Sequence, residues 1–307
     1  MELRHLRYFI AVAEEGHVTR AAERLGMQQP PLSQQIRGLE QELGVQLFRR
    51  KPRGVELTDA GRALLSDARA ILAHIEHAFA STRRTARGEQ GRIAIGFTSS
   101  APFHPFVPRV IRAFREAFPL VSLTLEESGT TEMIGDLREE RVDAAFIRTP
   151  VSDPAGLVVD RLLEEAMVVA LPSQHKLAQS GRSGTGVNLQ RLAGETFIVY
   201  RRHTGPGLYD AIIAACHAAG FSPLVGQEAP RIVATLNLVA AGLGLSIVPA
   251  SLQRMQMDGV TYRRLTGVIQ PKAPLHLASR RGDTASVVRQ FLTLVRQPAR
   301  TYRKDDA

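Results

Sequence analysis

The sequence predicts an α/β protein with a small helical N-terminal part and a larger part in which strands and helices alternate. Three observations lead to this prediction. Residues 1–60 hold two short apolar stripes at helical spacing, followed by two apolar runs around a basic turn. One long stripe with heptad-like spacing comes next. Beyond residue 91, short apolar runs typical of strands alternate with amphipathic stretches.

A pair of short helices joined by a tight turn is expected between residues 18 and 43. Thr19 or His17 is the candidate cap of the first helix, and Gly26 stands where a helix ends in a left-handed residue. Pro30 and Pro31 suit the first turn of the second helix, where their missing N–H groups would be unpaired anyway. The apolar stripes of the two helices are Val18, Ala21, Ala22 and Leu25, then Leu32, Ile36, Leu39 and Leu43.

The opposite face of the second helix carries side chains that can read DNA. Gln pairs bidentately with adenine, Arg with guanine or phosphate, and Ser with base edges or phosphate. The alternative is an ordinary amphipathic pair whose polar face meets only water. The side chains on this face are Gln29, Ser33, Gln34 and Arg37.

A hairpin with a basic tip is expected after the helix pair. Two short apolar runs flank a turn with Pro52 and Gly54, and four of the five residues from Arg49 to Arg53 are basic. Such a tip is often only solvated. Beside a DNA-reading helix it forms a wing that grips phosphate.

Residues 1–61 resemble the winged helix-turn-helix of the LysR-type transcriptional regulators. The matching stretches include Ala21 to Leu25, Gln29 to Ser33, Leu39 to Gly44, Leu47 to Arg50 and Leu57 to Gly61. The resemblance extends over nearly the whole chain and is nearest to the branch that regulates catabolism of aromatic compounds. We expect contacts with double-stranded promoter DNA from Thr19, Gln28, Gln29, Pro30, Pro31, Ser33, Gln34, Arg37, Arg50, Lys51 and Arg53.

Composition agrees with a DNA-binding protein only weakly. Residues 1–90 carry 14 basic and 11 acidic side chains, a net charge of +3, and residues 91–307 carry 25 and 19, a net charge of +6. The local basic cluster therefore counts for more than the total charge. A single cysteine, Cys216, excludes an internal disulfide. No secretory signal and no membrane span are expected, which predicts a cytoplasmic protein.

A long helix is expected from Thr58, its N-cap, to about Gly88. It carries a seam with alternating steps of four and three residues, which can pack inside one domain or pair two chains. The resemblance implies a homodimer through this helix, a homotetramer built from two dimers, and RNA polymerase as a further partner. His74 and His77 are taken as part of its polar face rather than as metal ligands. The seam consists of Leu64, Ala68, Ile71, Ile75 and Ala78.

Residues 81–91 lose this periodicity and are expected to form a hinge. Strands are then expected at 92–97, 121–126, 143–147, 167–171, 197–200 and 245–249, and helices at 105–118, 131–140, 207–219 and 232–241. This alternation predicts a mainly parallel sheet in two subdomains, which resembles a periplasmic binding protein. The expected division is 1–58 for the winged domain, 59–90 for the linker helix and hinge, and 91–307 for the effector domain. Subdomain I covers about 91–161 and 266–300, and subdomain II about 162–265.

Hydroxyl groups and cations follow several of these strands directly, where ligands bind in open α/β sheets. Each cluster can be a simple helix cap, but together they favour a cleft. Arg148 is a candidate carboxylate clamp or else part of a surface ion pair. Phe103, Phe106 and Phe146 are candidate apolar walls or core residues. The lining predicts a carboxylate inducer, an aromatic acid or a ring-cleavage dicarboxylate, at Thr98, Ser99, Ser100, Thr130, Arg148, His203 and Thr204.

Two other classes of protein, an enzyme and a solute-binding protein, are alternatives to a regulator. An enzyme would need a metal-ligand cluster, a P-loop or a nucleophile elbow, and the sequence shows none. Cys216 and His217 are adjacent on a helix and point apart, and the turn at Gly242 lacks a dinucleotide fingerprint. A solute-binding protein would match residues 91–295 alone. We therefore expect no catalytic residues, no cofactor and no metal.

Overall fold

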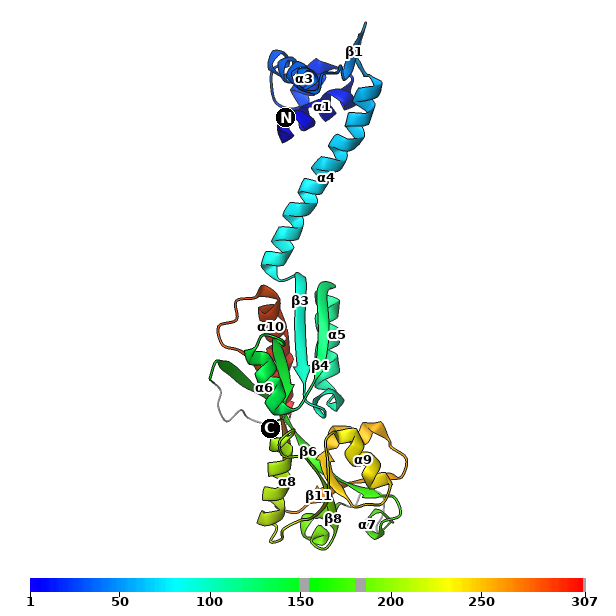
Figure 1. The fold of residues 1–307 in the computed structure, drawn as a ribbon, viewed down its shortest axis with the longest axis vertical. Coiled ribbons are helices and arrows are strands. Elements are labelled where there is room, and N and C mark those ends of the chain that lie inside the picture. The colour runs from blue at the N-terminus through cyan, green and yellow to red at the C-terminus, as the bar shows by residue number, and fades with distance from the viewer. Residues whose placement is uncertain (149–154, 180–185, 306–307) are drawn as a thin grey trace. The chain divides into compact units, whose positions relative to one another are not determined.

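The structure is a computed structural model that describes residues 1–148, 155–179 and 186–305. The last two residues of the expected effector domain, 306 and 307, lie outside these ranges. The chain divides into two compact units, Met1–Arg84 and Thr85–Ala307 (Figure 1).

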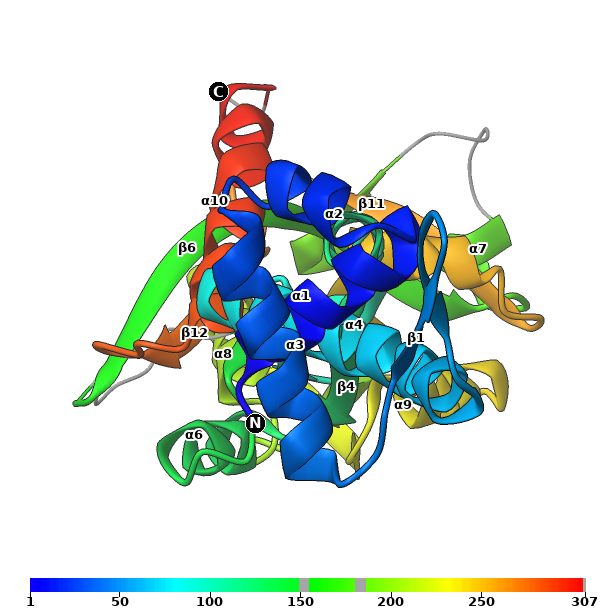
Figure 2. The ribbon, with the colours of Figure 1, turned by 90° about the horizontal axis from the view of Figure 1, so that it is seen from above.

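The N-terminal unit begins with three helices: α1 (Leu3–Glu15), α2 (Val18–Arg24) and α3 (Gln29–Leu43) (Figure 2). Each turns one apolar face to a common core, so the expected helix pair is confirmed and α1 completes it. Leu43 was wrongly expected on the buried face. It stands at the last helical turn and is 41% exposed. The buried residues include Leu6, Phe9, Val12, Ala21, Ala22, Leu32, Ile36 and Leu39.

The expected wing is an antiparallel hairpin of β1 (Phe48–Lys51) and β2 (Gly54–Leu57). The helix α4 (Asp59–Arg87) follows, and the backbone N–H of Gly61 donates to Thr58 Oγ1 at 2.9 Å, so Thr58 is its cap as expected. Helical structure continues through most of the expected hinge and stops at Gly88, whose φ of +73° is left-handed. The boundary between the two compact units, at Arg84 and Thr85, nevertheless falls inside the expected hinge segment 81–91.

The larger unit is built on a mixed sheet of eight strands within the described ranges. Parallel pairing holds among β3, β4 and β5 and between β11 and β7, but β12 runs antiparallel to β5 and β6, and β10 and β11 run antiparallel to β6. The expectation of a mainly parallel sheet was wrong for that part, because the chain returns between the lobes along two antiparallel strands. The order is β4 (Leu120–Glu127), β3 (Gln90–Phe97), β5 (Ala144–Ile147), β12 (Lys272–Arg280), β6 (Leu157–Pro172), β11 (Val260–Thr266) and β7 (Val187–Asn188), with β10 (Ser246–Pro249) also on β6.

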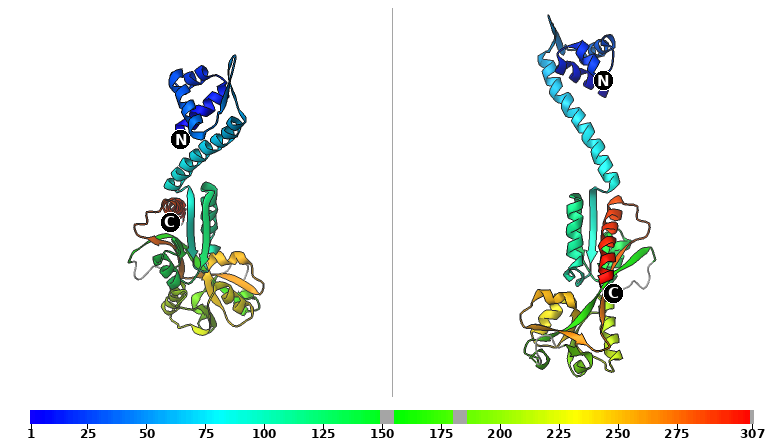
Figure 3. Two further views of the ribbon diagram at one scale, coloured as in Figure 1. Left: turned by 45° about the horizontal axis from the view of Figure 1, so that its top comes forward. Right: turned by 180° about the vertical axis from the view of Figure 1, so that it is seen from behind.

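Two lobes with separate cores hang on this sheet. In the first lobe, α5 (Phe106–Ala117) and α10 (Ser286–Asp305) flank β3, and α6 (Thr130–Arg138) covers the other face (Figure 3). The second lobe packs around the parallel pair β8 (Thr196–Tyr200) and β9 (Leu224–Ala229). Its helices are α7 (Lys176–Gln179), α8 (Pro206–Ala218) and α9 (Ile232–Ala240), and short 3-10 turns lie at Ala101–Phe103 (η1), Leu189–Leu192 (η2) and Ala250–Met255 (η3).

Both long strands cross from one core to the other. On β6, Leu163 packs in the first core and Met167 in the second; on β12, Ala273 packs in the second and Leu275 in the first. The change of lobe thus falls between Leu163 and Met167 on β6 and between Ala273 and Leu275 on β12, later in the chain than the expected subdomain boundaries near 161 and 266. None of the helices in the described ranges is long and apolar enough to span a membrane.

Candidate functional site

The N-terminal unit presents the expected DNA-reading side chains on its surface. Gln28, Gln29, Gln34 and Arg37 are exposed around the start of α3, as are Pro30 and Pro31 in its first turn. Ser33 is half-buried, and its Oγ accepts a hydrogen bond of 2.8 Å from Gln29 Nε2. Gln29 and Ser33 therefore hold each other in place when DNA is absent.

Of the two residues expected to cap α2, the structure has His17, and not Thr19, at the N-cap position. His17 is the N-cap residue, and neither its side chain nor that of Thr19 makes a capping bond. Thr19 is exposed within the first turn of the helix. Its hydroxyl group is thus available for a contact outside the protein.

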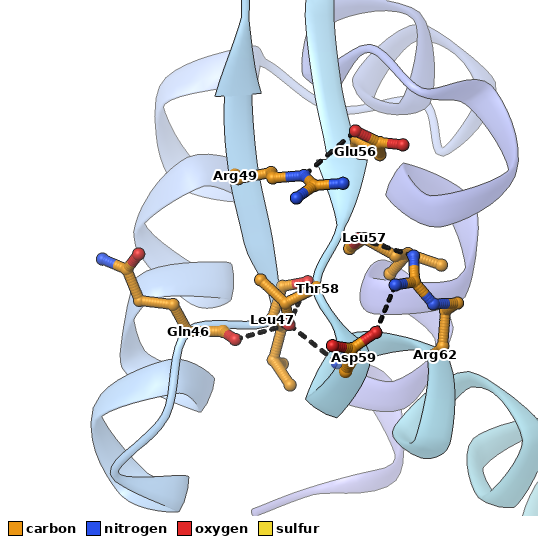
Figure 4. Close-up of polar contacts among 9 residues, drawn as sticks. Gln46, Leu47, Arg49, Glu56, Leu57, Thr58, Asp59 and Arg62 are labelled. Atoms are coloured by element: carbon orange, nitrogen blue, oxygen red, sulfur yellow. Dashed lines mark hydrogen bonds and ion pairs between the residues drawn. The ribbon is translucent and has the colours of Figure 1, made fainter.

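Glu56 divides the basic cluster of the wing into paired and unpaired cations. Its carboxylate lies 2.5 Å from Lys51 Nζ. Across the hairpin it lies 3.0 Å from Arg49 Nε (Figure 4). Hydrogen bonds from Lys51 and then Arg49 lower the pKa of Glu56 to about 2. Arg50 and Arg53 are exposed and make no ion pair within the described part of the chain. Arg50 and Arg53 are the side chains of the wing best placed to meet phosphate.

The wing is attached closely to the end of α1. The backbone N–H of Val55 donates to the carbonyl oxygen of Gly16 at 2.9 Å. Gly54 has a φ of +128°, and a Cβ on it would stand 2.2 Å from the same carbonyl oxygen. Glycine is therefore required at position 54, because a side chain would push the hairpin off the helix.

A cavity of about 240 Å³ opens in the larger unit between the two lobes. The loop after β3, the start of α6, the end of β5 and the turn before α8 all contribute to its wall. The structure brings together six of the seven expected effector residues: Thr98, Ser99, Ser100, Thr130, Arg148 and Thr204.

His203 does not line the cavity. Its side chain is exposed in the turn before α8, and its carbonyl oxygen accepts a hydrogen bond of 3.2 Å from Thr131 Oγ1. Next to it, the backbone N–H of Thr130 donates to the carbonyl oxygen of Thr204 at 2.9 Å. His203 thus belongs to a contact between the lobes, and its expected role as a lining side chain has to be corrected.

Arg148 lies in the cavity wall but is bound inside the protein. Its Nη2 lies 2.6 Å from Glu165 Oε1, and its side chain is only 3% exposed. The second oxygen of Glu165 accepts from the backbone N–H of Ser251 at 2.8 Å. Burial lowers the pKa of Arg148 and the Glu165 carboxylate opposes that shift. The guanidinium is therefore in a buried ion pair, neither the free clamp nor the surface pair considered from the sequence.

Among the described residues, three buried polar atoms of the cavity wall have no hydrogen-bond partner: Thr98 Oγ1, Arg148 Nε and Tyr200 Oη. Burial raises the pKa of Tyr200 far above its usual range, so the phenol stays a donor. Gly207 and Leu208 also line the cavity in the first turn of α8, where backbone N–H groups have no partner within the helix. The wall therefore offers several donors to an acceptor group of a ligand.

Several lining residues were not predicted. Tyr200 ends a correctly predicted strand, and its position directly before the hydroxyl-rich loop was a usable signal. Glu127 and Arg231 lie at the edge of the cavity and carried no local signal. Phe106 and Phe146 are fully buried in the first core, and Phe103 packs on the second, so none is an apolar wall.

Groups for metal or covalent chemistry do not gather here. In the described ranges, no three His, Cys, Asp or Glu side chains form a group that could hold a metal ion. Cys216 is buried in α8, and burial raises the pKa of its thiol to about 11. Its sulfur is therefore a poor nucleophile.

Comparison with known proteins identifies the class to which this architecture belongs. Residues 3–62 match the family described as "Bacterial regulatory helix-turn-helix protein, lysR family", and residues 86–300 match the "LysR substrate binding domain". The chain belongs to the LysR family. It is a ligand-responsive, DNA-binding transcriptional regulator rather than an enzyme.

Relatives and solved structures cover nearly the full chain. AlsR of Bacillus subtilis (strain 168) is 39% identical over 99% of both chains, and BenM of Acinetobacter baylyi (strain ATCC 33305 / BD413 / ADP1) is 36% identical over 97% of this chain and 96% of BenM. The crystal structure of full-length CbnR with its target DNA covers 97% of this chain and 100% of CbnR, at 31% identity and a TM-score of 0.85. AlsR and BenM match almost equally, so identity alone does not single out the branch for aromatic catabolism.

Proposed function

We propose that the cavity between the lobes binds a small carboxylate and that this effector controls the binding of promoter DNA. The observation that carries the proposal is the set of unpartnered donors at Thr98, Arg148 and Tyr200. Buried donors without partners are costly, so a ligand that supplies acceptor oxygens is stabilised there. The N-terminus of α8 adds N–H groups that favour an anion.

The size of the cavity limits the effector. Its volume of about 240 Å³ is below the roughly 300–1,000 Å³ of pockets for drug-sized ligands. The aromatic acid or ring-cleavage acid expected from the sequence remains one class to test, beside short aliphatic acids. Tyr200 supplies the one aromatic side chain among the described residues of the wall.

DNA is read by the start of α3 and held by the wing in this proposal. Gln28, Gln29, Gln34 and Arg37 reach base edges in the major groove, together with Ser33. Arg50 and Arg53 contact phosphate on the flanking backbone, and Lys51 does so only by leaving Glu56. Thr19, Pro30 and Pro31 lie at the rim of this surface.

A homodimer through α4 would present two such surfaces to DNA. Beyond Ala68 the seam leaves the core of the unit: Ile71 in the seam is 40% exposed, and Phe79 alongside it is 56% exposed. Exposed apolar side chains at this spacing favour pairing with the same helix of a second chain. Pairing of the larger units would extend the dimer to a tetramer, which bends the promoter and meets RNA polymerase.

Control by the effector needs two states with different affinity for it. The lobes touch at the edge of the cavity through Thr130–Thr204 and Thr131–His203. A ligand that bridges the wall stabilises this closed arrangement over an open one. The difference in lobe position is then passed to the assembly and to the spacing of the DNA-binding units.

Calorimetry and DNA binding test the proposal together. The full chain is titrated with aliphatic and aromatic carboxylates and with their neutral amides, and then footprinted on the DNA that flanks its own gene with and without each acid. We expect an acid, and not its amide, to bind and to change the protected region. Thr98→Val should weaken acid binding about 10–150-fold, since one hydrogen bond to a charged group is worth about 1.5–3 kcal/mol. Binding of amides alone would contradict the carboxylate.

A further inference from the structure

The mouth of the cavity carries an ion pair between the two lobes. Glu127 is the last residue of β4 in the first lobe, and Arg231 is the N-cap residue of α9 in the second. Arg231 Nη1 lies 3.0 Å from Glu127 Oε1 although the residues are 104 positions apart. Both side chains are exposed, Arg231 at 67% and Glu127 at 38%, and both line the cavity, so the outer end of a ligand in the cavity would lie beside this pair.

The charged groups of the wall cancel. Arg148 and Arg231 supply two positive charges, and Glu127 and Glu132 supply two negative ones. Arg148 is further compensated by Glu165 behind the wall. Glu132 accepts from the backbone N–H of Gly129 at 3.2 Å, so its carboxylate is held at the start of α6. The lining is therefore not cationic overall, which corrects the expectation from the sequence.

We propose that the Glu127–Arg231 pair makes this cavity select monocarboxylates over dicarboxylates. This inference rests on the proposed carboxylate effector and names its class. One carboxylate fits the donors at Thr98, Arg148 and Tyr200, while the outer end of the ligand meets a mouth that is already neutral or negative.

In the described part of the wall, no free cation lies at the outer end for a second carboxylate. Glu127 occupies Arg231, and Glu132 stands nearby in the same wall. The distal charge of a dicarboxylate must either lie against these carboxylates or take Arg231 from Glu127, which breaks a contact between the lobes. Like charges placed together in a site are a strong means of rejecting the wrong partner. A neutral outer end leaves the ion pair intact and the lobes closed.

The test compares acids that differ only in the second carboxylate. Calorimetry on the full chain uses butyrate against succinate, hexanoate against adipate, and benzoate against terephthalate. In each pair of acids for which binding is detected, we expect the monocarboxylate to bind at least about tenfold more tightly than the dicarboxylate. This ratio corresponds to about 1.4 kcal/mol. A dicarboxylate that binds as tightly as its monocarboxylate, or more tightly, refutes the proposed selection but not the proposal of a carboxylate effector.

Variants of the pair show whether it is the determinant. Glu127→Gln frees Arg231 and should reduce the preference to less than about threefold. Arg231→Gln leaves Glu127 without its cation and should increase the preference for monocarboxylates. Glu116→Gln is the matched control, because Glu116 is an exposed carboxylate of α5 that does not line the cavity. Equal ratios for Glu127→Gln and Glu116→Gln overturn the role of the pair. If no acid binds while DNA binding is intact, the proposal of a carboxylate effector is refuted, and the proposed selection for monocarboxylates is refuted with it.

Discussion

Glu40 of α3 is bonded to the first strand of the wing: its Oε1 accepts the backbone N–H of Leu47 at 2.8 Å and that of Phe48 at 3.1 Å. The residue therefore joins the helix that reads DNA to the hairpin that holds phosphate. Phe48 also packs on Phe9 of α1, with ring centroids 5.3 Å apart. One carboxylate and one aromatic pair thus fix the position of the wing.

Replacing Glu40 by Ala should loosen this connection. Two partly buried N–H groups would lose their acceptor, which costs about 1–3 kcal/mol for each unsatisfied group. We expect a lower melting temperature and weaker DNA binding in the full chain. Gln41→Ala is the control, because Gln41 is exposed on the same turn. Unchanged melting of the Glu40 variant would show that water replaces the carboxylate without loss.

The charges of the wing should appear in the salt dependence of DNA binding. Removing a phosphate contact lowers the slope of log K against log salt by about 0.9. Arg53→Ala should therefore reduce the slope by about one unit, and Glu56→Gln should raise it by releasing Arg49 and Lys51. Fluorescence anisotropy with labelled operator DNA measures this slope. Arg92→Ala, an exposed cation of the larger unit, should leave it unchanged.

The ion cluster of the wing should persist into strong acid. The pKa of Glu56 is lowered from 4.5 to about 2, so its contribution to stability is complete above the unfolded value. That contribution is lost as pH falls from 4.5 towards 2. Carbon NMR of the carboxyl group should give a midpoint near 2, and Lys51→Ala, which removes the largest cause, should move it up. A midpoint near 4.5 in the unmodified chain would mean that the pairs are not formed in solution.

Local patterns predicted the helices of the N-terminal unit well. In α3 and α4 the apolar spacing, Pro30 and the Thr58 cap all act within a few residues of each other. The strand β12 was missed because Pro274 lies inside its apolar run, which argues against a central strand. It is tolerated beside the register shift at Leu275 and His276. The helix α10 was missed although its apolar residues recur at helical spacing.

Local patterns also predicted part of the cavity wall. Thr98, Thr130 and Thr204 directly follow strands or precede helices, so their position at a sheet edge could be inferred. The ion pair between Arg148 and Glu165 could not be inferred from the sequence, because it depends on the register of β5, β12 and β6. Glu127 and Arg231 meet only through the closure of two lobes.

Glu165→Gln should destabilise the larger unit strongly. It removes one partner of a buried pair and leaves the Arg148 guanidinium uncompensated, which costs about 3–5 kcal/mol. Urea unfolding followed by circular dichroism measures the change, since the chain has no Trp as a fluorescent reporter. Glu164→Gln is the matched control: its partner Arg161 is 61% exposed, and such pairs contribute about 0–1 kcal/mol. Equal effects of the two variants would refute a special cost at Glu165.

The exposed seam of α4 predicts that this helix forms the dimer contact, which substitutions on the helix can test. Phe79→Asp places a charge on the apolar stripe that also holds Ile71 and Ile75, and it should lower the mass of the full chain in sedimentation. Ala73→Asp adds the same charge on the opposite, exposed face of the helix and should leave the mass unchanged. DNA affinity should fall with the mass, because a single reading unit loses the second half-site. Wild-type mass for both variants would place the dimer contact elsewhere in the chain.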